Sequence, residues 1–172
     1  MAIWQFRLIL LPEDELGELY PILPKSIPEE IAEDRVWWSS RQPQTGFEAQ
    51  IDAILPPMES WSQSMRMWGQ HDGNDAYVIY ADEDLAKVEQ ISFRIDARNI
   101  SPDLVHEICT LAKRMGCVFV THKYEILLPS ETDVLNAIES STAKSFVDDP
   151  ITTLKNLDTT KIEISLYPHE ES

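Results

Sequence analysis

Apolar and polar residues alternate along residues 3–11 (IWQFRLILL), close to the start of the chain. On an extended backbone, successive side chains point to opposite faces. One face of this segment carries Trp4, Phe6, Leu8 and Leu10. The other face carries the polar side chains of Gln5 and Arg7. The pattern therefore predicts an opening strand with one buried face.

The next segment, residues 12–34, has no long periodic pattern and is rich in proline and acidic residues. Because proline interrupts helices, only short helical turns fit here, over residues 13–19 and 28–32. We interpret residues 12–34 as an acidic, proline-rich surface segment. Beyond it, residues 35–39 (RVWWS) predict a short strand, and residues 46–55 predict a helix that two prolines end.

Three further strands are predicted in the middle of the chain, over residues 64–69, 76–81 and 87–96. The connecting sequences HDGND (71–75) and DEDL (82–85) consist of residues that turns favour. Short turns between consecutive strands predict an antiparallel meander.

The third of these strands has two distinct faces. Its apolar positions are Ile91, Phe93 and Ile95. The polar positions between them are Gln90, Ser92 and Arg94. This alternation predicts one buried face and one solvated face.

A helix over residues 102–115 has clear signals at both ends. Ser101 is a typical N-cap, Pro102 occupies the first helical position, and Gly116 follows the last turn. The apolar run 117–121 (CVFVT) comes directly afterwards and predicts a buried strand. If the strands on either side of the helix lie parallel in one sheet, the crossover should be right-handed.

The C-terminal part of the chain predicts two more helices and a strand. One helix begins after Ser130, and a shorter one begins at Pro150 with Asp149 as its cap. Residues 161–167 (KIEISLY) alternate again and predict an edge strand, followed by a tail at 168–172. No linker divides the chain, so we expect a single α+β domain over 1–172, with a mixed, mostly antiparallel sheet and helices packed on it.

The chain is strongly acidic, with 30 Asp and Glu against 14 Lys and Arg and a formal charge of −16. Nucleic acids and anionic membranes are bound through Lys and Arg, so both are excluded as expected partners. The acidic excess is concentrated in residues 1–34 and 129–172. It either serves to keep the protein in solution or steers it toward a basic protein partner.

Two observations concern the cellular compartment. No apolar run approaches the roughly 20 residues that span a bilayer, and the first residues do not form a secretory signal. The two cysteines, Cys109 and Cys117, stand in apolar surroundings, as buried free thiols do. We therefore expect a cytoplasmic protein.

No motif for catalysis, metal binding or a cofactor is visible. None of the four histidines stands in a nucleophilic motif, and His71 belongs to a sequence that a hairpin turn explains better than a metal site. Five glycines form no phosphate-binding loop. We predict no catalytic residue, no metal and no cofactor; an enzyme whose site assembles from distant segments, with His71 and His122 as candidates, stays open.

The tryptophans are the best candidates for partner binding. Trp37 and Trp38 are adjacent, and on a strand they would point to opposite faces, so at least one should lie at a surface, in a groove or beneath a loop such as 12–34. Tryptophan is enriched at interaction hot spots. The predicted partner-binding residues are Trp37, Trp38, Trp61, Asp82, Glu83 and Asp84.

In its general character, with the WW pair at 37–38 and the segments LLP at 127–129 and DDP at 148–150, the chain resembles the immunity proteins of bacterial toxin systems. The resemblance implies a protein that binds and neutralises a cognate toxin. Our leading hypothesis is a non-enzymatic acidic binding protein for a basic partner. The alternatives are a self-associating structural or regulatory subunit and the enzyme mentioned above.

Overall fold

The computed structural model describes residues 1–157, which form one seven-stranded sheet. Its spatial order is β2-β3-β4-β5-β1-β6-β7, and each neighbouring pair is antiparallel. The bounds are β1 (Gln5–Pro12), β2 (Pro57–Met58), β3 (Met65–Gly69), β4 (Asp75–Tyr80), β5 (Val88–Asp96), β6 (Cys117–Thr121) and β7 (Ile126–Leu127). The predicted α+β class and the meander, formed by β3, β4 and β5, are confirmed.

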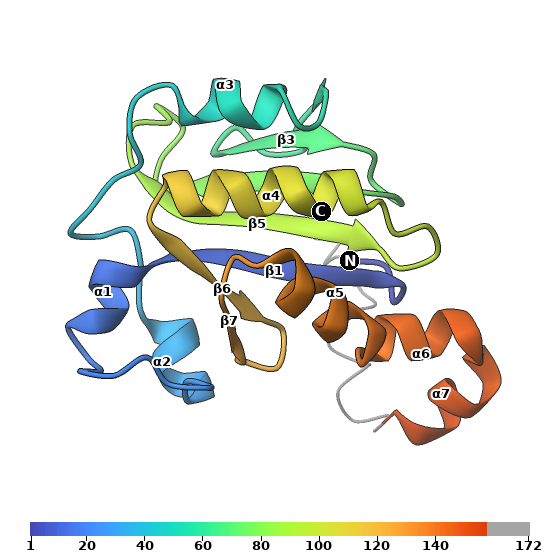
Figure 1. Ribbon diagram of the computed structural model, residues 1–172. Helices are drawn as coiled ribbons and strands as arrows, with labels where there is room; N and C mark the ends of the chain where they lie inside the picture. Colours follow the sequence, from blue (N-terminus) through green and yellow to red (C-terminus); the bar gives the residue numbers. More distant parts are fainter. Residues whose placement is uncertain (158–172) are drawn as a thin grey trace, which may run out of the picture.

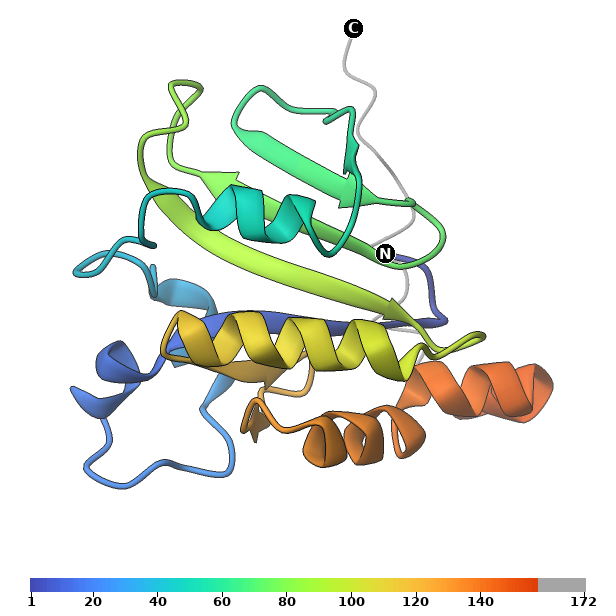
Figure 2. The same ribbon diagram turned by 45° about the horizontal axis from the view of Figure 1, so that its top comes forward.

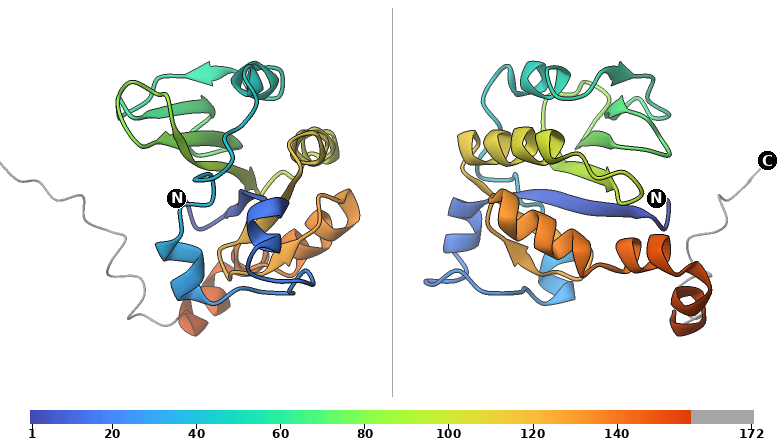
Figure 3. Two further views of the ribbon diagram at one scale, coloured as in Figure 1. Left: turned by 90° about the vertical axis from the view of Figure 1, so that its left-hand side faces the viewer. Right: turned by 45° about the vertical axis from the view of Figure 1, so that its right-hand side comes forward.

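The helices cover the sheet unequally. Their bounds are α1 (Glu13–Gly17), α2 (Glu29–Asp34), α3 (Phe47–Asp52), α4 (Pro102–Arg114), α5 (Glu131–Glu139), α6 (Thr142–Asp148) and α7 (Pro150–Asn156). Helices α3, α4 and α5 lie on one side of the sheet, whereas α2 lies on the other (Figure 1 and Figure 3). The short helices expected within residues 12–34 are present as α1 and α2.

Strand β1 lies between β5 and β6 and pairs with both. Since each neighbour is antiparallel to β1, β5 and β6 run parallel to each other. Helix α4 connects them by crossing in front of the sheet in Figure 1, and the crossover is right-handed, as expected.

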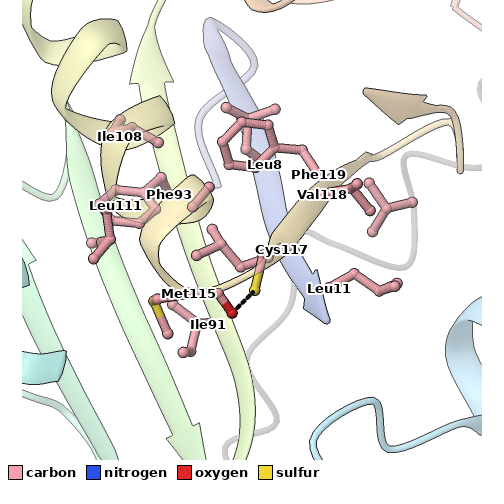
Figure 4. Close-up of a cluster of buried hydrophobic side chains, with 14 of the residues drawn as sticks. Leu8, Leu11, Ile91, Phe93, Ile108, Leu111, Met115, Cys117, Val118 and Phe119 are labelled. Carbon is pink, nitrogen blue, oxygen red and sulfur yellow. Dashed lines mark hydrogen bonds between the residues drawn. The ribbon is translucent and has the colours of Figure 1, made fainter. Parts of the chain in front are cut away.

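The main core lies between the sheet and α4. Figure 4 shows Phe93 of β5 and Phe119 of β6 packed with Leu8 of β1 and Ile108 of α4. All four side chains are almost completely buried. The apolar positions predicted for β1, β5 and the strand after α4 thus form one continuous core.

Helix α4 begins and ends as its sequence predicts. The hydroxyl oxygen of Ser101 accepts a hydrogen bond from the backbone N–H of Leu104 at 3.3 Å, and Pro102 is the first helical residue. Gly116 follows the helix with φ of +64°, a left-handed conformation that favours glycine.

Replacing Ser101 by Ala is expected to lower the free energy of unfolding by about 1 kcal/mol, because one backbone donor of the first turn loses its acceptor. Ser101→Gly should lower the free energy of unfolding by only a few tenths of a kcal/mol, since glycine suits the N-cap backbone. Urea denaturation followed by circular dichroism measures both. Equal losses for the two variants would contradict the capping role.

The predicted strand at 35–39 is wrong: this segment forms turns between α2 and the connection to α3. Its backbone forms no ladder with the sheet. The consequence for Trp37 and Trp38 is described below.

The predicted solvated face of β5 is also wrong in part. Ser92 and Arg94 are both buried. Ser92 Oγ accepts a hydrogen bond from Gln90 at 2.8 Å, and Arg94 pairs with Asp75 of β4. Polar side chains of β5 thus pair with one another and with a side chain of β4 on this face of the sheet.

The C-terminal helices follow the prediction more closely. Ser130 caps α5, and Asp149 caps α7 with Pro150 as its first residue. Helix α6 and the short β7 were not predicted, because neither has a distinctive period. The predicted strand at 161–167 and the tail at 168–172 lie outside the described residues.

Candidate functional site

Trp61 is the most exposed large aromatic side chain of the predicted site, with 75% of its surface accessible. It lies in the connection from β2 to β3. Serines on either side shape this connection: Ser60 Oγ donates to the carbonyl of Ser62 at 2.9 Å, and the hydroxyls of Ser62 and Ser64 lie 3.2 Å apart. The indole of Trp61 faces solvent.

The acidic triplet Asp82-Glu83-Asp84 lies in the connection from β4 to β5, and all three side chains are exposed. Asp84 accepts a hydrogen bond from the backbone N–H of Ala86 at 3.0 Å, and Leu85 adopts a left-handed backbone with φ of +56°. Within residues 1–157, none of the three carboxylates forms an ion pair. Their charges are therefore directed to solvent.

These two connections lie at the same end of the sheet (Figure 2). The backbone N–H of Tyr80, at the end of β4, donates to the carbonyl of Ser64, at the start of β3, at 2.9 Å. We call Trp61 and the triplet Asp82-Glu83-Asp84 the Trp61 surface. Four of the six predicted partner-binding residues thus lie on connections at this end of the sheet.

Trp37 and Trp38 do not join them, because both side chains are buried. The expectation that at least one would lie at a surface, in a groove or beneath a loop assumed a strand. The observed segment is a turn, and both rings are buried. Trp37 Nε1 donates to the carbonyl of Ala32 in α2 at 3.3 Å, and the Arg35 guanidinium lies 5.2 Å from its ring centre. The packing against α2 fits the alternative in which the 12–34 segment covers the ring.

A buried carboxylate that sequence reasoning missed holds this region to the sheet. Glu15 of α1 is almost inaccessible and accepts hydrogen bonds from Arg35 at 2.9 Å and from the backbone N–H of Ser40 at 2.8 Å. Burial alone would raise the pKa of Glu15, but these bonds keep that pKa below its ordinary value. No local pattern signals this role, because its partners lie 20 and 25 residues away.

A buried ion pair, which sequence reasoning also missed, links strands β4 and β5. Arg94 of β5 donates from Nε to Asp75 Oδ1 at 2.6 Å and from Nη2 to Oδ2 at 2.5 Å. Asp75 is completely buried and Arg94 nearly so. Burial raises the pKa of the Asp75 carboxyl, and the two bonds from Arg94 oppose that rise.

His122 and His106 serve packing and a surface pair. His122 meets the edge of Phe6 with ring centres 6.4 Å apart, and burial lowers its pKa, which favours the neutral ring. His106 Nδ1 lies 2.7 Å from an oxygen of Glu131 on the surface. Across residues 1–157, no three side chains of His, Cys, Asp or Glu are grouped so that they would hold a metal ion.

The two thiols should resist alkylation in the folded protein. Burial raises the pKa of Cys109 to about 11 and that of Cys117 to about 12, so little reactive thiolate forms at pH 8. We expect iodoacetamide at pH 8 to leave both cysteines unmodified in buffer and to modify both in urea. Intact-protein mass spectrometry measures the result, and rapid labelling in buffer would contradict their buried positions.

In the part of the chain that the structure describes, no helix is both long enough and apolar enough to cross a membrane. Comparisons with protein-family models, with curated proteins and with solved structures find no match to this chain.

Proposed function

We propose that this protein is a non-enzymatic acidic binding protein that docks a basic protein partner on the Trp61 surface. The observation that carries the proposal is that an exposed tryptophan and three carboxylates, which form no ion pair within residues 1–157, lie on two connections at the same end of the sheet (Figure 2). The partner class that we favour is a basic protein toxin, as the resemblance to immunity proteins implies, and binding would neutralise it by occlusion.

The chemistry of the Trp61 surface suits such a partner. An indole supplies a large apolar contact at a small loss of conformational entropy, which is why tryptophan is frequent among binding hot spots. Carboxylates at the rim and a net charge of −16 would raise the rate of encounter with a basic protein. Salt should therefore weaken the complex mainly by slowing association.

A competing surface lies beside α1 and α2. A shallow groove there combines the partly exposed apolar side chains of Leu19, Ile31 and Val36 with the carboxylates of Glu30 and Asp34. It belongs to the acidic, proline-rich segment and its continuation. We rank it second because it has no exposed aromatic anchor.

The decisive comparison uses the protein immobilised as bait in lysate from its native cell, at low and moderate salt. The baits are wild type, Trp61→Ala, the triple variant D82N/E83Q/D84N, and L19S/V36S for the competing groove. A charge-matched control, E107Q/E125Q/E139Q, removes the same number of charges from exposed positions elsewhere. Quantitative mass spectrometry reads the retained proteins.

We expect one basic protein to be retained by wild type, the charge-matched control and the groove variant. Trp61→Ala and the triple variant should each reduce its recovery by about tenfold. Loss with the groove variant alone would move the interface to α1 and α2. Recovery of the bait alone from every lysate would contradict the proposal and favour self-association.

A further inference from the structure

A cleft lies between the connection from α2 to α3, helix α3 and the C-terminal end of α4. Its volume is about 320 Å³, at the small end of the range for small-molecule sites. The side chains that line it come from that connection, α3 and α4: Trp38, Arg41, Gln42, Pro43, Gln44, Gln50, Arg114 and Met115.

The residues that line the cleft differ in charge from the chain as a whole. They include two arginines and three glutamines but neither Asp nor Glu, although acidic residues outnumber basic ones by 30 to 14 in the chain. The side chains that line the cleft are therefore cationic and rich in hydrogen-bond donors, although the molecule as a whole is strongly acidic. None of them belongs to the Trp61 surface.

Arg41 is held in place before any ligand arrives. Its Nη1 donates to Asp14 at 2.8 Å, and its Nη2 donates to the carbonyl of Met115 at 3.0 Å. The guanidinium also lies against Gly116, where a Cβ would be only 3.3 Å from it. Of the five N–H groups of an arginine side chain, about three stay free for a ligand.

Other donors around the cleft lack partners. Arg114, Gln44 and Gln50 form no side-chain hydrogen bond or ion pair with the residues in 1–157. Trp38, with 1% of its surface exposed, has an indole N–H without a hydrogen-bond partner in the same range. A buried donor such as this indole N–H is normally satisfied. Arg114 and Gln44 are exposed and Gln50 is partly exposed, so their donors are open to the acceptors of a ligand.

We propose that this cleft binds a small organic carboxylate. The planar guanidinium groups of Arg41 and Arg114 match the two oxygens of a carboxylate, and the amides of Gln44 and Gln50 offer further donors. The ring of Trp38 and the side chains of Pro43 and Met115 provide an apolar wall for the carbon part of the ligand. Such binding is independent of the protein partner proposed above.

The test follows the indole N–H signal of Trp38 by NMR while the full-length protein is titrated with benzoate. Benzamide serves as the uncharged analogue, and inorganic phosphate serves as the anion without an apolar part. The variants are Arg114→Gln and, as a matched control, Lys113→Gln, which removes the same charge one residue away on an exposed position.

Benzoate should shift the Trp38 signal saturably, and Arg114→Gln should weaken its binding by about tenfold or more, because a charge-assisted contact is lost. Lys113→Gln should change the affinity by less than about twofold. Benzamide and phosphate should each bind at least about tenfold more weakly than benzoate. The absence of a saturable shift, equal affinities for Arg114→Gln and wild type, or phosphate binding as tight as benzoate would overturn the proposal.

Discussion

Asp75→Asn is expected to lower the free energy of unfolding by about 3–5 kcal/mol, because it leaves the guanidinium of Arg94 buried without its counter-charge. Asp75 is completely buried, and it accepts two hydrogen bonds from Arg94 across the β4–β5 pair. Once the carboxylate is gone, Arg94 can regain solvation only by disturbing the strands around it. Urea denaturation monitored by tryptophan fluorescence gives the value.

Two further variants isolate the effect. Asp96→Asn breaks an ion pair whose arginine, Arg98, is half exposed, so its cost should stay below about 1 kcal/mol. The double variant D75L/R94M replaces the whole buried pair by apolar side chains and should recover most of the stability that Asp75→Asn loses. Equal costs for Asp75→Asn and Asp96→Asn would show that burial of the Asp75 pair does not control its contribution.

Trp38→Ala is expected to destabilise the fold by about 3–5 kcal/mol, whereas Trp61→Ala should change stability by no more than about 0.5 kcal/mol. Trp38 is among the largest fully buried side chains, so its truncation opens a cavity in the core. Trp61 contacts solvent over most of its surface, so its removal exposes nothing new. Thermal and urea unfolding of both variants measure the difference.

This comparison also separates folding from binding. Trp61→Ala should keep the fold and lose the partner, which makes it the informative variant for function. Trp38→Ala would lose both, through unfolding. If Trp38→Ala were as stable as wild type, the assignment of the 35–39 segment to the core would be contradicted.

Elements with local signals were predictable from the sequence. The N-cap Ser101 with Pro102 and the terminating Gly116 marked α4 almost to the residue, and alternation marked β1 and β5. These signals depend on neighbours within a few positions, so a single sequence contains them.

Features that depend on distant partners were not predictable. The turn that buries Trp37 and Trp38 relies on Glu15 and on α2, and the Asp75–Arg94 pair depends on the register of two strands. A period-two pattern places Arg94 on a solvated face, and only the neighbouring strand reveals its burial. For the predicted site, the turn residues around 82–84 followed from local sequence. The exposure of Trp61 had no local signal, and the position of both connections at one end of the sheet depends on the meander.

The most direct test of the central claim is photo-crosslinking from position 61. The protein is expressed in its native cell with p-benzoylphenylalanine in place of Trp61 and, as a control, in place of the similarly exposed Ile151 of α7. After irradiation, we expect one basic protein to be attached through position 61 and not through position 151. The D82N/E83Q/D84N substitutions should suppress that product. Equal products from both positions, or no product from position 61, would contradict the Trp61 surface as the binding site.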